Sequence, residues 1–130
     1  GRFVAKFSCR GSLAILSDVI TDTLKKTSGK TDLKWWLYFP SIGEYTSLLE
    51  SNGIEPFYAS ISEDFTPLED GNEGLANWIR TFIPVMYPDL KPEEIEEAIP
   101  EIEAKTKDML YKNGIWHINY RRIQVAGEKR

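Results

Sequence analysis

The chain has 130 residues, 42% of them hydrophobic and 28% charged, with a net charge of -4. This composition is typical of a soluble globular domain, its acidic balance argues against a nucleic-acid-binding surface, and no apolar run approaches the ~18 residues of a membrane span. The single cysteine, Cys9, excludes an internal disulfide framework and favours a reducing, cytoplasmic compartment.

The first predicted elements are a strand and an amphipathic helix. Residues 2–7 alternate as a strand does, with one apolar face made of Phe3, Ala5 and Phe7. Apolar residues then recur at helical spacing, which predicts a helix over about 12–27. Ser12 is expected to be its N-cap, and Gly29 stands just past its end.

The middle of the chain predicts a short helix and a second strand. The aromatic run 35–39 precedes them. Ser41 is expected to cap the helix, which closes at Asn52-Gly53. Residues 54–61 resume a strand pattern, in which Pro56 favours an edge position or a late start.

The last third predicts two helices and a closing strand. Residues 66–74 are expected to be a loop, followed by a helix that begins at Leu75 and stops near Pro84 to Pro88. Pro92 suits the first turn of a further helix that ends at Asn113-Gly114, and Pro100 is expected to kink or split that helix. Residues 115–125 alternate as one long strand.

Three strands and four or five helices make a small sheet with many helices, without an internal repeat. The first strand is apolar at most positions, and such strands usually have neighbours on both sides. The chain also begins with Gly1 in place of methionine. We therefore expect that part of the sheet lies outside this sequence.

The familiar motifs of cofactor and metal binding are absent. The chain has no G-x-G-x-x-G, no phosphate-binding loop, no C-x-x-C and no H-E-x-x-H. With one histidine and one cysteine, it cannot assemble a histidine-cysteine metal site by itself. His117 is expected to be a structural or surface residue, with a substrate contact as the alternative. A nucleophilic pair of Cys9 and His117 has no local support.

The charged and aromatic clusters each have a structural and a functional interpretation. The glutamates between 93 and 103 lie opposite an isoleucine stripe and are expected to form a solvated helix face. Arg121 lies in an exposed strand or, like Arg80, pairs with an anionic substrate, because guanidinium binds carboxylate in a bidentate way. The aromatic residues, Trp78 among them, belong to the core or line a pocket for a small organic molecule.

Several segments, in order along the chain, resemble the C-terminal half of class I S-adenosylmethionine-dependent methyltransferases, in particular relatives of trans-aconitate methyltransferase. Residues 1–7 resemble the fifth strand of that fold, with Gly1 as the last glycine of a Pro-Gly-Gly turn. The remaining segments are YFPSIGEY at 38–45, LLE at 48–50, NGI at 52–54, TPLE at 66–69, GL at 74–75, NWIR at 77–80 and YRR at 120–122.

The resemblance implies an α/β fold, or α+β for this part taken alone. Its three strands would be the 5-7-6 end of a Rossmann-like sheet, a three-stranded mixed sheet with four or five helices, and residues 1–130 would be the C-terminal portion of the methyltransferase domain. In this family, a Gly-rich loop after the first strand and an acidic residue ending the second hold the cofactor. Neither is present, so no cofactor-binding residue is expected here, and the cofactor-binding half would lie upstream of Gly1.

The resemblance implies that this part of the fold binds the methyl acceptor. The candidate substrate-binding residues are Trp35, Tyr38, Trp78, Arg80 and Arg121. The aromatic side chains would exclude water and an arginine would orient an acceptor carboxylate, for which positioning is enough and no general base is required. The sequence identifies no catalytic residue and no metal ligand.

The leading hypothesis is therefore the C-terminal part of a methyltransferase that acts on a small molecule, with a carboxylate as a candidate acceptor. Alone, this part is expected to be inactive, to bind no S-adenosylmethionine, and to self-associate through the edge of the strand Arg2–Phe7. Nucleic-acid and membrane partners are not expected. The alternative is a free-standing, non-catalytic module that binds a small molecule or a protein.

Overall fold

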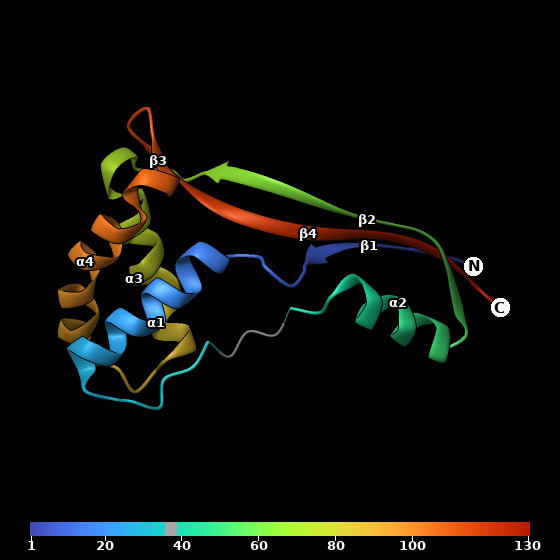
Figure 1. The fold of residues 1–130 in the computed structure, drawn as a ribbon, viewed down its shortest axis with the longest axis horizontal. Helices are drawn as coiled ribbons and strands as arrows, with labels where there is room; N and C mark the ends of the chain where they lie inside the picture. The colour runs from blue at the N-terminus through green and yellow to red at the C-terminus, as the bar shows by residue number, and fades with distance from the viewer. Residues whose placement is uncertain (36–38) are drawn as a thin grey trace. The chain divides into compact units, whose positions relative to one another are not determined.

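The computed structural model describes residues 1–35 and 39–130, and its class is α/β (Figure 1). In chain order the elements are β1 (Arg2–Ser8), α1 (Ala14–Ser28), α2 (Ile42–Ser51), β2 (Ile54–Pro67), the 3-10 turn η1 (Gly71–Glu73), α3 (Gly74–Met86), α4 (Pro92–Leu110), β3 (Tyr111–Lys112) and β4 (Ile115–Lys129). The described residues form two compact units. Unit 1 contains residues 1–12, 39–64 and 119–130, and unit 2 contains residues 13–35 and 65–118.

The sheet differs from the expected three-stranded mixed sheet. Its main path is β1-β4-β2, and the short β3 also pairs with β4, so a fourth strand changes both the count and the order. β1 pairs antiparallel with β4 from Arg2 opposite Glu128 to Ser8 opposite Arg122, and β3 pairs antiparallel with β4 as well. β2 lies at one end of the main path, which agrees with the edge position favoured by its proline.

The extra strand arises at Asn113-Gly114, where the end of a helix was expected. The helix already ends at Leu110, and Tyr111–Lys112 form β3. Asn113 and Gly114 have φ of 54° and 76°. Positive φ at both positions is the requirement of the two-residue hairpin turn for which Asn-Gly is the preferred sequence, so this dipeptide joins β3 to β4.

Unit 1 contains β1, most of β2 and β4, and one helix, α2. Its buried cluster consists of Cys9, Leu49, Ile123 and Val125, with the partly buried Phe3, Phe7, Ile42, Tyr45 and Ile54 packed against it. Phe3 and Phe7 lie on one face of β1, as the alternation predicted. α2 begins with a capping box, in which the Ser41 side chain accepts from the Glu44 N–H and the Glu44 carboxylate accepts from the Ser41 N–H.

Unit 2 is built on three helices, with α4 packed against both α1 and α3. The core side chains of these helices are fully buried at Leu16, Ile20, Leu24, Leu75, Ile79, Ile83 and Ile102. α4 continues through Pro100, so the expected split does not occur. Pro100 is exposed, and its missing N–H removes one hydrogen bond from the helix without ending it.

Two further boundaries differ from expectation. β2 extends to Pro67 and η1 follows, so 66–74 is only partly a loop. Leu13, with φ of 60°, occupies the N-cap of α1 without a side-chain cap, and the Ser12 hydroxyl instead accepts the backbone N–H of Arg121. None of the helices in the described part of the chain is long and apolar enough to span a bilayer.

Candidate functional site

Arg121 is fixed through its backbone to the segment that follows β1. Its carbonyl accepts the N–H of Cys9 at 2.9 Å. Its own N–H donates to the Ser12 hydroxyl at 3.0 Å. Because both backbone groups are bound, Arg121 has a defined place at the carboxyl end of β1, the end of a strand at which α/β sheets commonly bind ligands.

The Arg121 side chain has three neighbours in unit 1. Nε lies 3.3 Å from a carboxylate oxygen of Glu63. Nη1 donates to the carbonyl of Arg10 at 3.2 Å. The stem lies against Gly11, where an added Cβ would come within 3.2 Å of Cδ. These contacts orient the plane of the guanidinium.

The guanidinium nevertheless has binding capacity left. The Arg121 side chain is 38% exposed, and its partner Glu63 is 59% exposed. An exposed ion pair of this kind contributes little stability, so Glu63 is a weak competitor for a ligand. Among the described residues, no partner is recorded for Nη2, which leaves donors for a carboxylate. The arrangement can bind a carboxylate at the carboxyl end of β1.

An apolar groove belongs to the same unit. It has a volume of about 750 Å³ and is lined by Phe7, Ser8, Phe39, Pro40, Glu44, Tyr45 and Leu48. The rings of Phe7 and Tyr45 meet edge to face, 4.5 Å apart. Glu44 of the groove accepts from the Arg10 side chain at 2.7 Å, and the Arg10 carbonyl accepts from Arg121. The groove is therefore suited to the hydrocarbon part of a molecule bound near Arg121.

Cys9 belongs to the core of unit 1. Its side chain is buried in the cluster that contains Ile123. Burial raises the pKa of the Cys9 thiol, and the Arg121 charge offsets this only in part. The thiol therefore stays protonated at neutral pH, which argues against a nucleophilic role.

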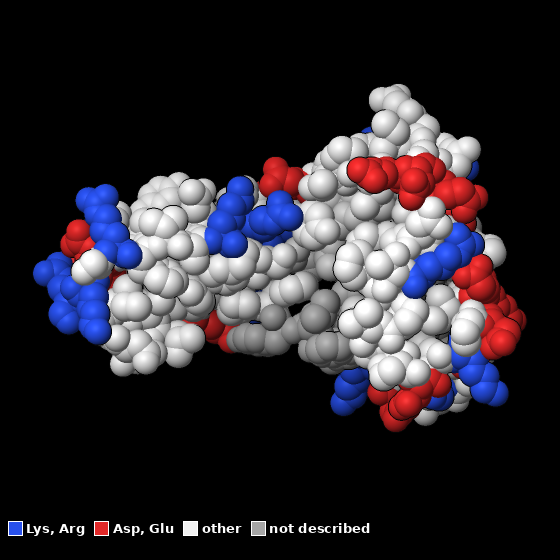
Figure 2. All heavy atoms as spheres, turned by 180° about the vertical axis from the view of Figure 1, so that it is seen from behind, with Lys and Arg blue, Asp and Glu red and all other residues white. Residues whose placement is uncertain are grey.

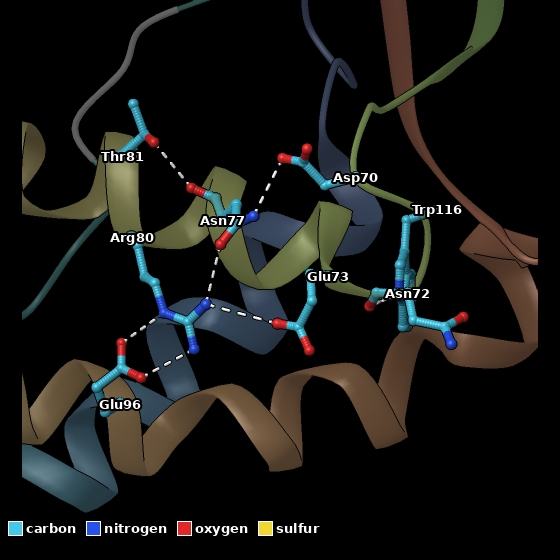
Figure 3. Close-up of polar contacts among 8 residues, drawn as sticks. All are labelled: Asp70, Asn72, Glu73, Asn77, Arg80, Thr81, Glu96 and Trp116. Carbon is cyan, nitrogen blue, oxygen red and sulfur yellow. Dashed lines mark hydrogen bonds and ion pairs between the residues drawn. The ribbon is translucent and has the colours of Figure 1, made fainter.

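Arg80, the second candidate arginine, is held by its own helices in unit 2 (Figure 3). Its guanidinium binds Glu96 of α4 at 2.8 and 2.9 Å, and it lies 3.6 Å from Glu73. Nη1 also donates to Asn77 at 3.0 Å. The bond from Arg80 lowers the pKa of the Glu96 carboxyl. With these donors bound, Arg80 links α3 to α4 and presents fewer free donors than Arg121.

Trp78 lines a separate hollow in unit 2. The hollow has a volume of about 300 Å³, and its lining residues are Pro67, Leu68, Glu69, Asp70, Gly74, Asn77, Trp78 and Thr81. The ring of Phe82 lies 5.2 Å from that of Trp78. Trp78 and Arg80 thus share α3, whereas Arg121 belongs to the other unit.

The remaining sequence candidates are less informative. Trp35 is half-buried, and its indole nitrogen is shielded without a hydrogen-bond partner. Tyr38 lies outside the described residues. His117 is half-buried, with Nδ1 shielded and unpartnered. Of the five candidates, Trp78 and Arg80 are therefore the two that lie on one element.

Two glutamates of α4, Glu96 and Glu101, form ion pairs with other helices. Glu101 binds Lys26 of α1 at 3.0 Å, in addition to the pairing of Glu96 with Arg80. Figure 2 shows acidic side chains gathered on the surface of the helical unit. Within residues 1–35 and 39–130, no three histidine, cysteine, aspartate or glutamate side chains are placed to share a metal ion.

Comparison with known proteins adds no relative. No protein-family model matches the chain, and no curated protein matches it.

Sequence reasoning identified Arg121 but missed its surroundings. Glu63 and Ser12 belong to no recognised motif. They lie 58 and 109 residues from Arg121 in the sequence, and only the packing of the chain brings them next to it. Only the alternation of β4 indicated which neighbours share a side of the strand with Arg121.

Proposed function

We propose that this chain is the acceptor-binding, C-terminal portion of an S-adenosylmethionine-dependent methyltransferase that acts on a small carboxylic acid. The observation that carries the proposal is the position of Arg121. A half-exposed guanidinium with unused donors lies at the carboxyl end of β1, beside an apolar groove in the same unit. This combination suits a molecule with a carboxylate and a hydrocarbon part.

The strand arrangement supports the methyltransferase assignment. With β3 set aside, the last long strand lies between the first and the second, and it is antiparallel to the first. In the resembled fold, the seventh strand lies between the fifth and the sixth in the same way. The quoted sequence segments fall mainly on these strands and on α2 and α3, which supports the proposed correspondence.

We expect the cofactor site to lie outside this chain. The turn from β1 to α1 contains one glycine, Gly11, and the close contact there is with the Arg121 side chain. No Gly-rich phosphate or nucleotide loop occurs in the sequence. We therefore assign to this chain only the binding and orientation of the acceptor. Arg121 would hold the carboxylate, and the groove would exclude water from it.

The test is a methyl-transfer assay on the product of the complete reading frame, with radiolabelled S-adenosylmethionine and a panel of small carboxylic acids. We expect transfer to at least one acid, and we expect Arg121→Met to raise KM by roughly 10- to 100-fold, the loss of one charged bidentate contact. Arg122→Met is the control, because Arg122 faces Asp64 and the Tyr120 ring. Absence of transfer, or equal effects of the two variants, would contradict the proposal.

A second candidate function is a non-catalytic binding module, and the open apolar groove favours it. The two are separated by the residues encoded before Gly1. A Gly-rich strand-loop-helix there supports the methyltransferase, and an initiating methionine directly before Gly1 supports the module. Calorimetry on the 130-residue chain adds a second criterion, because we expect no binding of S-adenosylmethionine to it.

A further inference from the structure

A further cavity lies wholly within unit 2 and takes no part in the proposed function. It has a volume of about 570 Å³, within the range of small-molecule sites, and its lining residues are Lys30, Asp32, Leu33, Lys34, Met86, Tyr87, Pro88, Asp89 and Leu90. One wall is the segment that follows α1, and the other is the connection between α3 and α4 (Figure 1). Because the cavity shares no residue with the groove of unit 1, a ligand in it can be tested independently of the methyl acceptor.

Hydrogen bonds join the two walls of the cavity. The Tyr87 hydroxyl donates to the carbonyl of Lys34, and Nζ of Lys30 donates to the carbonyl of Asp89 at 3.2 Å. The connection between the helices is itself a β-turn, in which the N–H of Leu90 donates to the carbonyl of Tyr87 at 3.1 Å and a proline occupies the second position. These bonds hold the walls in place before a ligand arrives, which lowers the cost of binding.

Lys30 brings a half-buried positive charge to the cavity. Its ammonium group has three donors, and the carbonyl of Asp89 accepts one of them. The lysines that form ion pairs among the described residues are Lys26 and Lys105, so no carboxylate of this part of the chain is paired with Lys30. Removing a charge from water without a counter-charge is unfavourable, and an anionic group of a ligand would supply that counter-charge.

Asp89 provides the opposite charge beside Lys30. Because its carbonyl accepts the Lys30 ammonium, its side chain belongs to the same part of the lining. Its carboxylate is exposed, and within residues 1–35 and 39–130 no ion pair or hydrogen bond is recorded for it. The whole lining contains two lysines and two aspartates, so its charges balance. A ligand with one charge would leave one sign unpaired, whereas a zwitterion pairs both.

The rest of the lining is apolar. Met86, Tyr87 and Leu90 are each less than a tenth exposed, so they form a surface that suits a hydrocarbon or aromatic group. A methionine thioether also packs favourably against an aromatic ring. We propose that this cavity binds an α-amino acid with an apolar side chain, whose carboxylate accepts from Lys30 and whose ammonium group pairs with Asp89.

The experiment is an NMR titration of the isotope-labelled 130-residue chain without cofactor. The probes are phenylalanine, 3-phenylpropanoate, which lacks the ammonium group, and 2-phenylethylamine, which lacks the carboxylate. We expect saturable shifts of the amide signals of Leu33 and Leu90. We expect each analogue to bind roughly tenfold more weakly than phenylalanine, the low end of the range for a hydrogen bond to a charged group.

Two variants separate the two charges. Lys30→Met keeps a long side chain without the ammonium group, so it should weaken the binding of phenylalanine and 3-phenylpropanoate and leave that of 2-phenylethylamine unchanged. Asp89→Asn retains a residue that turns favour and should weaken phenylalanine and 2-phenylethylamine instead. Lys25→Met is the control, because Lys25 lies in the last turn of α1 and does not line the cavity. It should change the binding of none of the three probes.

The selectivity of the variants distinguishes a binding role from a structural one. If Lys30 and Asp89 only held the walls together, both variants would weaken all three probes alike and would lower the thermal midpoint, which is measured for each variant. That result would overturn the proposal. Absence of saturable phenylalanine binding to the wild type, or shifts confined to the groove of unit 1, would overturn it as well.

Discussion

The side chain of Arg121 lies directly on the backbone of Gly11. A Cβ at Gly11 would come within 3.2 Å of Cδ and 3.3 Å of Nη1, and the φ of Gly11 is +92°. Glycine is thus favoured at this position for two reasons, the left-handed backbone and the close approach of the arginine side chain.

We predict that Gly11→Ala destabilises the protein more than Gly29→Ala. Gly29 also has a positive φ, +72°, but nothing lies within 4 Å of its added Cβ. Gly29→Ala should lower the free energy of unfolding by about 1 kcal/mol, the cost of the left-handed backbone alone. Gly11→Ala should lose about 1 kcal/mol more and bind a small carboxylic acid such as hexanoate more weakly, because the arginine must shift. Denaturant titration and NMR measure the two effects, and equal losses with unchanged binding would show that Gly11 does not position Arg121.

Replacement of Pro100 should stabilise the protein. Pro100 lies inside α4 and is exposed, so Pro100→Ala restores a helical backbone donor without disturbing the core. We expect a gain of about 1–3 kcal/mol in the free energy of unfolding. Pro92→Ala, at the first position of the same helix, should bring no such gain because proline is favourable there. A loss of stability in Pro100→Ala would contradict this account.

Glu103 should make the protein less stable at neutral pH. Burial raises the pKa of its carboxyl, and the neighbouring Glu73 raises it further. A raised pKa in the folded state means that its stability contribution is present at low pH and is lost as the pH rises through that pKa. Glu103→Gln should therefore raise the thermal midpoint at pH 7 and change little at pH 3. A lower midpoint at pH 7 would contradict the prediction.

Glu96 should behave in the opposite way. The bond from Arg80 lowers the pKa of its carboxyl. A lowered folded pKa contributes stability above the unfolded value of about 4.3, which is lost as the pH falls through the folded pKa. Glu96→Gln should thus lower the midpoint slightly at pH 7, and the difference should disappear in acid. The effect is small because both side chains are largely exposed. If the midpoints of Glu96→Gln and the wild type differ by the same amount at pH 7 and at pH 3, the ion pair is not the cause of the difference.

We also propose that the 130-residue chain self-associates through β1. β1 pairs with β4 on one side and ends the path β1-β4-β2 among the described strands. Two copies of β1 can pair as antiparallel strands with Ala5 of one copy opposite Ala5 of the other. In this register no two side chains of like charge lie opposite each other. Phe3 then lies opposite Phe7, and Val4 opposite Lys6, so aromatic pairs form and no two cations face each other.

Val4 offers a matched pair of variants, because its side chain is 70% exposed. Val4→Lys places a cation opposite Lys6 of the second copy and should shift the chain toward monomer. Val4→Glu places an anion there and should maintain or strengthen the association. Sedimentation equilibrium measures both. A wild type that stays monomeric at high concentration, or equal behaviour of the two variants, would contradict the proposed register.

The local elements could be predicted from the sequence because their causes are local. The alternation of Phe3, Ala5 and Phe7, the capping pair Ser41 and Glu44 and the periodic apolar residues of α1 all act within a few residues. The same reasoning failed where two local interpretations competed. Asn113-Gly114 fits a helix end as well as a hairpin turn, and only the pairing of Tyr111 with Trp116 decided between them.

The candidate site depended on contacts that no local pattern contains. The sequence by itself determined that Arg121 lies in a strand and that Ser12 precedes a helix. The tertiary structure decided that the Ser12 hydroxyl binds the backbone of Arg121, 109 residues away, and that Glu96 takes the guanidinium of Arg80. The physical reason is that periodicity determines the side of a strand or helix on which a residue lies, whereas its polar partners are fixed only when distant segments pack together.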